Sequence, residues 1–252
     1  MTLSKNKIKY INSLRIKKFR QKYNNFIAEG DKIAREIILQ QNVEIEAIYA
    51  TASWIDTYES QLSVGRDKVF NISITELKGI STLKTANEVL IIAKQPSFKL
   101  SPEILKKQLI LYLDAIQDPG NMGTILRIAD WFGIPAVYCS EECADLYNPK
   151  VVQASMGAFL RVSVNTSSLE TIKSKLEIPV LGATLQGENV YKMDLPEAGI
   201  IVIGNESKGI RPSNLELLTH QIKIPSFGDG GAESLNAGVA TGIICSQFRG
   251  KG

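Results

Sequence analysis

The sequence contains few of the residues that carry most nucleophilic and metal chemistry. Its 252 residues include a single histidine, His220, and three cysteines, Cys139, Cys143 and Cys245. Histidine chemistry is confined to His220, which lies near an expected strand start, and Cys139 and Cys143 have no neighbouring histidine or further cysteine to complete a zinc site. We therefore expect no metal, reduced thiols, and any catalysis to rest on Asn, Arg, Glu and Ser side chains.

Long apolar runs and export signals are also missing. No apolar run approaches the roughly 18 residues that span a bilayer, and the charged N-terminus lacks the apolar region of a signal peptide. A hydrophobic content of 44% and a charged content of 22% are typical of soluble globular proteins. We expect a cytoplasmic protein that has no membrane partner and forms one large domain or two small ones.

Acidic residues are absent from residues 1–28, which carry a charge of +8 although the whole chain carries only +3. Ile8, Ile11 and Leu14 follow helical spacing, and Ser4 is placed to cap that helix. A basic helix laid along a phosphate backbone is one interpretation, and a solvated arm of ordinary lysines is the other. A membrane-surface helix is disfavoured because the apolar stripe is thin and lacks Trp. The cations are Lys5, Lys7, Lys9, Arg15, Lys17, Lys18, Arg20 and Lys22.

Common nucleotide-binding patterns are absent from the second half of the chain. No G-x-G-x-x-G follows its first strand, and Lys208 precedes Gly209 instead of completing a Walker A loop. The segment from residue 108 alternates expected strands with helices, which predicts a mostly parallel sheet flanked by helices. We expect its strands at 109–116, 136–139, 160–164, 179–185, 200–204 and 221–224.

The first half predicts a separate small α/β unit. Strands are expected at 45–50, 69–72 and 88–93, and a helix at 29–40. A segment that contains prolines and serines follows and is typical of a linker. These features divide the chain into residues 1–95, a linker at 96–107 and a second domain at 108–252.

Three polar loops follow strands of the second domain, at the strand ends where ligands bind in open α/β sheets. They lie at 118–133, with a helix expected from about Met122, at 201–212 and at 224–236. The third contains Gly228, Gly230 and Gly231, which allow a ligand to approach closely. Ser234 is placed to cap the last helix, with Leu235 and Asn236 in its first turn. That helix start would direct backbone N–H groups at an anionic or polar ligand.

The last helix also carries small residues where bulky ones are usual, so we expect a close packing partner against it. These small residues are Ala237, Gly238, Ala240, Gly242 and Cys245.

The three loops together resemble one protein family. N-x-G-x-x-x-R at 121–127, I-G-N-E-x-x-G at 203–209, and I-P followed by S-L-N within 224–236 are similar to the three ordered motifs of the SpoU (TrmH) family. That family comprises S-adenosylmethionine-dependent RNA 2′-O-ribose methyltransferases of the SPOUT class. The resemblance implies a trefoil-knotted, mostly parallel sheet with helices on both faces, and a homodimer whose sites are completed across the interface. The glycine-rich loop before S-L-N is longer than the family's usual form.

Two further segments extend the resemblance. F-x-x-E-G at 26–30 matches the start of the substrate-binding domain that many family members carry, which resembles the ribosomal-protein L30e fold. S-M-G-A-F-L-R-V at 155–162 resembles the family's segment between the first two motifs. The implied partner is RNA rather than DNA, with ribosomal RNA favoured over transfer RNA.

The resemblance also implies roles for individual residues. Arg127 would contact the phosphate beside the target ribose and is the residue proposed to receive the 2′-hydroxyl proton. Because arginine is effectively always protonated, the roles of phosphate clamp and general base both stay open. The other polar positions of the family's active site match Asn121, Glu206, Ser234 and Asn236. The positions where the family's backbone cradles the cofactor match Thr184, Gly204, Ile224 and Leu235.

Structural interpretations stand beside these roles. Asn121 and Ser234 could cap helices, and Glu206 could accept backbone N–H groups. Two other functions are also open for the chain: a catalytically silent RNA-binding or ribosome-associated protein, and a small-molecule enzyme on a generic α/β sheet. Retention of the polar motif residues disfavours the first, and the basic N-terminus disfavours the second.

Overall fold

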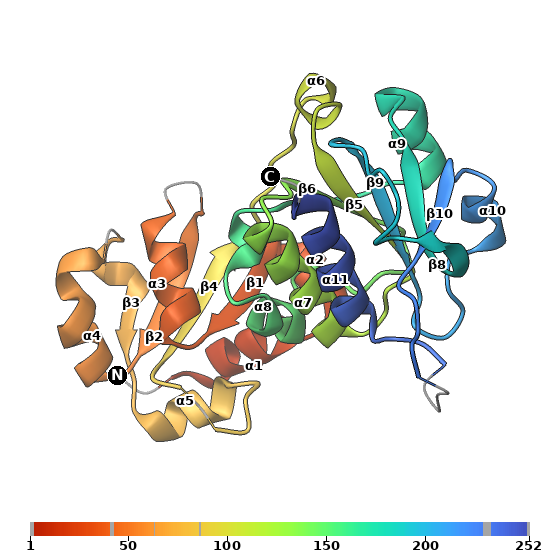
Figure 1. Cartoon of the computed structure of the whole chain (residues 1–252). Helices are drawn as coiled ribbons and strands as arrows, with labels where there is room; N and C mark the ends of the chain where they lie inside the picture. Colours follow the sequence, from red (N-terminus) through yellow and green to blue (C-terminus); the bar gives the residue numbers. More distant parts are fainter. Residues whose placement is uncertain (1–2, 41–42, 63, 86, 229–232, 251–252) are drawn as a thin grey trace. The chain divides into compact units, whose positions relative to one another are not determined.

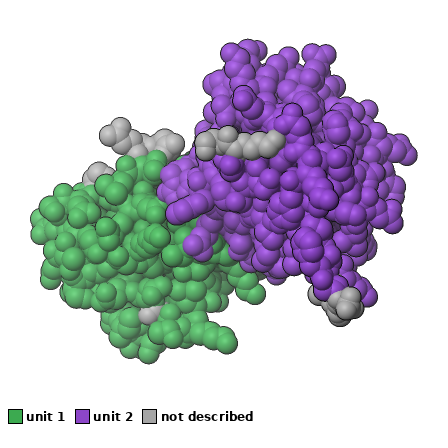
Figure 2. Space-filling view, viewed as in Figure 1, with its two compact units in different colours: residues 1–97, 145–160 green, residues 98–144, 161–252 purple. Residues whose placement is uncertain are grey.

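The computed structural model describes residues 3–40, 43–62, 64–85, 87–228 and 233–250 (Figure 1). The chain forms two compact units, one from residues 1–97 and 145–160 and the other from 98–144 and 161–252 (Figure 2). Within the described residues, no helix has the length and apolar character needed to cross a bilayer.

A four-stranded sheet in the order β1-β4-β2-β3 forms the centre of the first unit. Strands β1 (Asn25–Glu29), β4 (Val89–Lys94) and β2 (Ile45–Ala50) pair antiparallel, and β3 (Val69–Asn71) runs parallel to β2. The predicted strands at 45–50, 69–72 and 88–93 are therefore confirmed to within a residue. The unit's helices are α1 (Lys5–Ser13), α2 (Lys17–Tyr23), α3 (Asp31–Leu39), α4 (Ala52–Tyr58), α5 (Ile74–Ile80) and α8 (Pro149–Ser155).

The F-x-x-E-G segment has a structural function in this unit. The helix expected from residue 29 begins instead at Asp31, because Glu29 still belongs to β1 and pairs with Leu90 of β4. Gly30 turns the chain between strand and helix with a φ of 94°, which side chains rarely adopt. The buried Glu29 carboxylate accepts the backbone N–H of Thr82 at 2.8 Å. Strand β1 is thereby tied to the segment that follows α5.

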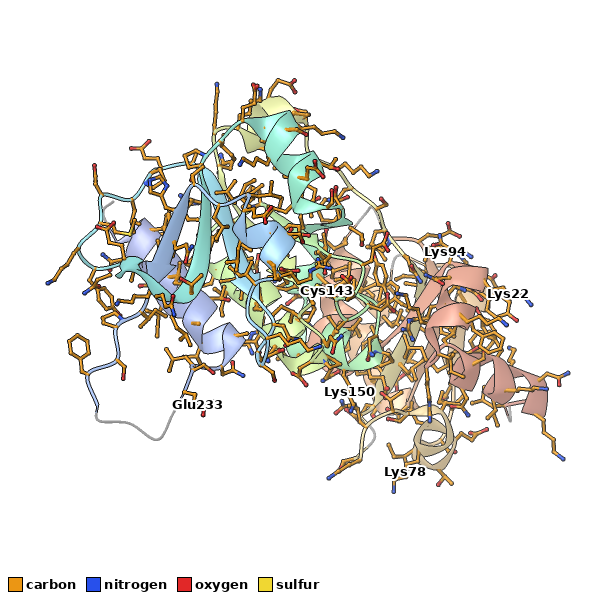
Figure 3. All side chains as sticks on the ribbon, turned by 90° about the vertical axis from the view of Figure 1, so that its right-hand side faces the viewer. Lys22, Lys78, Lys94, Cys143, Lys150 and Glu233 are labelled. Atoms are coloured by element: carbon orange, nitrogen blue, oxygen red, sulfur yellow. The ribbon has the colours of Figure 1, made fainter. Side chains whose placement is uncertain are left out.

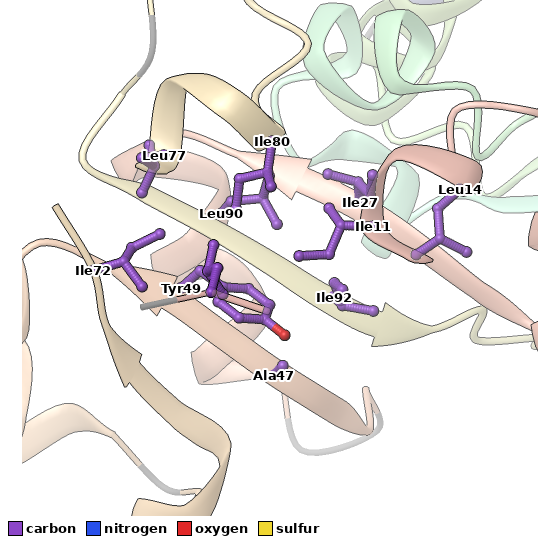
Figure 4. Packing of buried hydrophobic residues seen from close by; sticks show 11 residues of the cluster. Ile11, Leu14, Ile27, Ala47, Tyr49, Ile72, Leu77, Ile80, Leu90 and Ile92 are labelled. Carbon is purple, nitrogen blue, oxygen red and sulfur yellow. The ribbon is translucent and has the colours of Figure 1, made fainter. Parts of the chain in front are cut away.

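The basic N-terminal segment is packed against the sheet rather than extended as an arm. The Ser4 side chain accepts the Lys7 backbone N–H, which confirms the predicted cap of α1. Ile11 and Leu14 are fully buried in a cluster that includes Ile27 of β1 (Figure 4). The apolar stripe therefore belongs to the core of the unit, and the lysines between its members face outward.

Residues 145–160 complete the first unit, although they come from the middle of the second half of the sequence. The Phe26 ring lies 5.1 Å from the Tyr147 ring and 5.5 Å from the Phe159 ring, centroid to centroid. Arg20 is 2% exposed, pairs with Asp145 and donates to two backbone carbonyl groups. One of the eight N-terminal cations is thus a structural residue.

The second unit contains a six-stranded sheet in the order β10-β8-β9-β5-β6-β7, and all of its pairs are parallel. This architecture confirms the expected mostly parallel α/β fold. The expected strand at 160–164 begins only at residue 163, because residues 158–160 form a short 3-10 helix. The strands are β5 (Leu109–Asp114), β6 (Ala136–Cys139), β7 (Ser163–Thr166), β8 (Val180–Asn189), β9 (Gly199–Gly204) and β10 (His220–Lys223).

Helices pack against this sheet from segments before, between and after its strands. They are α6 (Pro102–Leu105), α7 (Pro119–Trp131), α9 (Leu169–Leu176), α10 (Pro212–Leu215) and α11 (Ala237–Arg249). Ile110 and Tyr112 of β5 pack with Leu169 of α9, so by strand alternation Leu111 faces the opposite side of the sheet. Figure 1 shows α7 and α11 side by side.

Candidate functional site

Three segments meet at the carboxyl edge of the second unit's sheet. They follow β5, β9 and β10, and they correspond to the three polar loops predicted from the sequence. Because neighbouring parallel strands end at the same edge, their loops are brought together there. Gly230 and Gly231 of the third loop lie outside the described residues.

One chain of side-chain hydrogen bonds joins the three segments. The Asn121 amide nitrogen donates to Glu206 Oε1 at 2.6 Å, and Asn121 Oδ1 accepts from the Asn236 amide nitrogen at 2.8 Å. Glu206 Oε2 also accepts from Asn205 Nδ2 at 3.3 Å. The donor and acceptor ends of the Asn121 amide are both used, which fixes the orientation of its side chain. We call Asn121, Glu206 and Asn236 the amide relay.

Asn236 also begins the last helix. Its Oδ1 accepts the backbone N–H groups of Gly238 and Val239 at 3.0 and 3.2 Å, and its backbone is not helical. The prediction that Ser234 caps this helix, with Leu235 and Asn236 in the first turn, is therefore wrong. Asn and Ser are comparably good caps, so the sequence contained two adequate candidates, and Asn236 is the one whose oxygen reaches the free N–H groups.

Helix α7 begins earlier than expected, at Pro119, and Asp118 is its cap. The Asp118 carboxylate accepts the Asn121 backbone N–H at 2.8 Å. Asn121 is therefore not the helix cap, and its side chain remains available for the amide relay.

The loop that carries Glu206 is a tight turn. Asn205 and Gly209 exchange backbone hydrogen bonds at 3.0 and 2.9 Å, and Gly209 has a φ of 67°. A Cβ on Gly204 would lie 2.3 Å from the carbonyl carbon of Gly209. The turn thus requires glycine at 204, which is a structural reason for this residue independent of any cofactor.

Arg127 lies further along α7 and is exposed. By helical geometry it is about 9 Å along the axis from Asn121. Its guanidinium forms no hydrogen bond or ion pair with any residue that the structure describes. Ser234 is exposed as well, and it takes no part in the hydrogen bonds of the amide relay. The site therefore combines a fixed amide relay with a cation that is available to an external anion.

The residues matched to cofactor binding come from neighbouring strands and their continuations. Thr184 of β8 donates to Gln221 of β10 at 3.2 Å, and Gly204 ends β9. Ile224 follows β10 and is half-buried, whereas Leu235 precedes α11 and is 48% exposed. Two apolar side chains, a hydroxyl and strand-end backbone are groups that suit a nucleoside, which needs a surface for its base and partners for its polar edge.

The small residues of α11 pack against α7 of the same chain. A Cβ on Gly238 would lie 2.9 Å from Thr124, and one on Gly242 would lie 3.6 Å from Ile128. The close partner expected from the sequence is therefore α7. This contact places Asn236, at the start of α11, beside Asn121, at the start of α7.

Sequence reasoning overlooked three residues that support the site. Asn205 Nδ2 donates to the Ala115 carbonyl at 2.8 Å, and Arg211 pairs with the buried Asp114. An acidic residue that ends an otherwise apolar strand was the available signal for Asp114.

Comparison with known proteins agrees with this geometry. Residues 108–246 match the model of the SpoU rRNA Methylase family, and residues 5–91 match that of the MRM3-like substrate binding domain. The fold and the three-loop site thus define a methyltransferase-type α/β protein. More specifically, the chain belongs to the SpoU rRNA methylase family.

Individual relatives span nearly the whole chain. The 23S rRNA (guanosine(2553)-2′-O)-methyltransferase RlmP of Bacillus subtilis is 28% identical over 97% of this chain and 96% of its own. A solved TrmH-family structure from Porphyromonas gingivalis is 36% identical, with a TM-score of 0.87 and complete coverage of both chains. An AdoMet-bound rRNA methyltransferase from Sinorhizobium meliloti, 24% identical, covers 100% of this chain and 97% of its own with a TM-score of 0.87, and so shares the fold.

Proposed function

We propose that this protein is an enzyme that uses S-adenosylmethionine to methylate a ribose 2′-hydroxyl of ribosomal RNA. The observation that carries the proposal is the amide relay, which joins all three family motifs beside an exposed Arg127 that has no partner among the described residues. A cytoplasmic location, ribosomal rather than transfer RNA as substrate, and RNA rather than DNA belong to the same proposal.

The residues present fit this chemistry. S-adenosylmethionine, when bound, supplies an electrophilic methyl group, and Thr184, Gly204, Ile224 and Leu235 would hold it. A ribose hydroxyl is a poor nucleophile at neutral pH, so positioning and proton removal must provide most of the rate enhancement. Arg127 would bind the phosphodiester beside the target ribose through its planar, two-pronged donor geometry.

The amide relay would hold the three loops in fixed positions relative to one another during this reaction. Asn236 fixes the start of α11 while Asn121 fixes Glu206. Each bond joins segments that are far apart in sequence, so one relay residue can misplace the others when it is changed. We assign Asn121, Glu206 and Asn236 to the active site on this ground. Ser234, which contributes to neither the cap nor the relay, is assigned only by its match to the family motif.

The first unit would bind the RNA. Ile11 of α1 and Leu14 just after it are buried, whereas the lysines of α1 and α2 are exposed, which Figure 3 illustrates for Lys22. Arg20 is excluded from this surface because it is buried against Asp145. We define the basic face as the exposed side chains of Lys5, Lys7, Lys9, Lys17, Lys18 and Lys22.

We also propose that two copies associate through the outer surfaces of α7 and α11. The small residues of α11 pack against α7 of the same chain, so the proposed interface consists of exposed apolar side chains. Trp131 of α7 is 84% exposed, and Val239 of α11 is 52% exposed. Exposed apolar side chains on two helices that pack together are typical of an interaction surface.

Two measurements test the main proposal. Ribosomal RNA from cells with and without the gene is mapped for 2′-O-methylation, and the purified protein is assayed for cofactor binding by calorimetry. We expect one methylated nucleotide to disappear with the gene, and cofactor binding by the protein. Cofactor-free RNA binding with an unchanged methylation map would instead support a silent RNA-binding protein. Cofactor binding without RNA binding would support a small-molecule enzyme.

A further inference from the structure

A buried ion pair lies behind the loop that carries Glu206. Asp114 is the last residue of β5 and is 0% exposed. Its carboxylate accepts the backbone N–H of Arg211 at 2.8 Å and the side-chain Nε of Arg211 at 2.6 Å. A buried carboxylate is stable only where such hydrogen bonds replace water. Arg211 ends the 205–211 loop, so the pair fixes that end of the loop to β5.

The other end of the same loop is fixed to the next residue of the chain. Asn205 Nδ2 donates to the Ala115 carbonyl at 2.8 Å, and Ala115 has a left-handed φ of 58°. The Ala115 backbone N–H donates to the Ser140 hydroxyl at 3.0 Å. Asp114 and Ala115 therefore hold both ends of a seven-residue turn, and Glu206 lies within that turn.

We propose that Asp114 is a positioning residue for methyl transfer, acting through Arg211 to keep Glu206 within hydrogen-bond distance of Asn121. The proposal rests on the proposed function. Asp114 is buried beneath the loop, so its effect on the reaction is indirect.

The negative charge of Asp114 determines the position of the 205–211 loop. Arg211 Nε forms a charge-assisted bond with the buried carboxylate, while its Nη1 binds the exposed Glu142 at 2.8 Å. An asparagine at 114 would keep the shape of the side chain. Its NH₂ group, however, would face one of the two N–H donors of Arg211 and could not accept a hydrogen bond from it. The Arg211 end of the loop would then shift, and the 2.6 Å bond between Glu206 and Asn121 would lengthen.

The test compares Asp114→Asn with Glu142→Gln, which removes only the exposed partner of the same arginine. In single-turnover methylation of ribosomal RNA, we expect Asp114→Asn to lower the rate by roughly tenfold to a hundredfold, the range seen for small misplacements of catalytic groups. The KM for RNA should stay unchanged because neither the basic face nor Arg127 is altered. Glu142→Gln should stay within about twofold of the parent protein.

Hydrogen exchange of the peptide spanning 203–212 supplies a readout that does not depend on activity. We expect faster exchange in Asp114→Asn than in the parent protein or in Glu142→Gln, at a temperature where all three are folded. Should Asp114→Asn fail to fold, Arg211→Lys provides the second variant, because it retains a cation near the carboxylate but loses the Nε contact. The same loss of rate and faster exchange are expected of it.

An unchanged single-turnover rate together with unchanged exchange in the folded variant would overturn the proposal. So would equal losses in Asp114→Asn and Glu142→Gln. If the parent protein methylates no RNA, the proposed function fails, and the exchange data still decide whether Asp114 holds the loop.

Discussion

Asn121 donates its side-chain amide to Glu206, a residue 85 positions further along the chain, at a distance of 2.6 Å. The same amide accepts from Asn236, 115 positions away. The Asn121 side chain therefore holds three segments that are distant in sequence in one fixed arrangement. A substitution at Asn121 should therefore displace the Glu206 side chain, and substitutions at Asn121 and at Glu206 should have similar effects on the methylation rate.

This relationship predicts strong coupling between the two residues. Asn121→Ala and Glu206→Ala each remove one partner of the same hydrogen bond, so the double variant should lose little more activity than either single variant. We expect a coupling energy of about 1.5–3 kcal/mol, the range for hydrogen bonds that involve a charged group. Single-turnover methylation rates of all four proteins give this value, and strictly additive losses would show that the bond has no function in the reaction.

Arg127 is expected to behave differently, because it forms no bond within the relay. Arg127→Ala should nearly abolish methylation while cofactor binding persists, since the phosphate contact is lost and the relay is intact. Arg127→Lys should restore little, because an ammonium lacks the planar pair of donors. Calorimetry with the cofactor is run beside the methylation assay. A fully active Arg127→Ala variant would eliminate this arginine as both phosphate clamp and general base.

The sequence predicted which segments form helices and strands better than it predicted the residues at which they begin and end. Strand β6 falls within the boundaries predicted from apolar runs, because a buried parallel strand has a strong and short signature. The cap of α11 was misassigned because Ser234 and Asn236 are both good capping residues two positions apart. Which of them caps is decided by the bond between Asn236 and Asn121, a contact between residues far apart in the chain.

Long-range packing explains the other differences. Arg20 has the same sequence context as the neighbouring lysines, yet it is buried, because Asp145 lies against it in the folded unit. Local periodicity could not show that residues 145–160 complete the first unit. Three motifs in the right order did predict that Asn121, Glu206 and Asn236 come together, although the bonds that join them required the structure.

Cys143 should be the reactive thiol of this protein. Hydrogen bonds from Cys139 and then Ser140 lower the pKa of Cys143 to about 7, although burial raises it. Burial raises the pKa of Cys245 to about 12, and a hydrogen bond to Cys143 together with burial raises the pKa of Cys139 well above its usual value. The thiolate of Cys143 should therefore form as the pH rises through about 7.

Alkylation with iodoacetamide, read by peptide mass spectrometry, tests this order. We expect Cys143 alone to react at pH 8, with a rate that falls with a midpoint near pH 7 as the thiolate is protonated. A midpoint near that of an ordinary thiol, or equal labelling of the buried Cys245, would contradict the expectation. The Cys143→Ser variant is the control, because it should take up no label at that peptide.

The basic face can be tested by removing charge without disturbing the core. Deleting residues 1–22 would remove Ile11 and Leu14 from the core of the first unit, so substitution of exposed lysines is the cleaner change. Replacing Lys5, Lys9, Lys17 and Lys18 by Gln should weaken RNA binding and reduce the slope of log affinity against log salt by up to about 3. Cofactor affinity and thermal stability should not change. RNA affinity that is unaltered at every salt concentration would make these lysines ordinary solvated side chains.

Arg20 provides the matched contrast within the same segment. Arg20→Met removes one member of a buried ion pair and leaves Asp145 without its partner, so we expect about 3 kcal/mol of lost stability. Urea denaturation measures this loss. A stability change as small as that of the lysine variant would show that the pair with Asp145 contributes nothing to folding.

Substitution of the exposed tryptophan of α7 tests whether the protein forms a dimer through this helix. Trp131→Glu would place a charge where an 84% exposed indole now offers apolar surface, so a dimer formed there should dissociate. Leu39→Glu, at a 68% exposed apolar position of the first unit, is the matched control and should leave the dimer intact. Sedimentation of the three proteins at micromolar concentration gives the oligomeric state, and methylation is measured on the same samples.

If the active site is completed across the interface, the monomeric variant should also lose methylation. A parent protein that sediments as a monomer, or a Trp131→Glu variant that remains a dimer, would remove the α7–α11 surface as the interface.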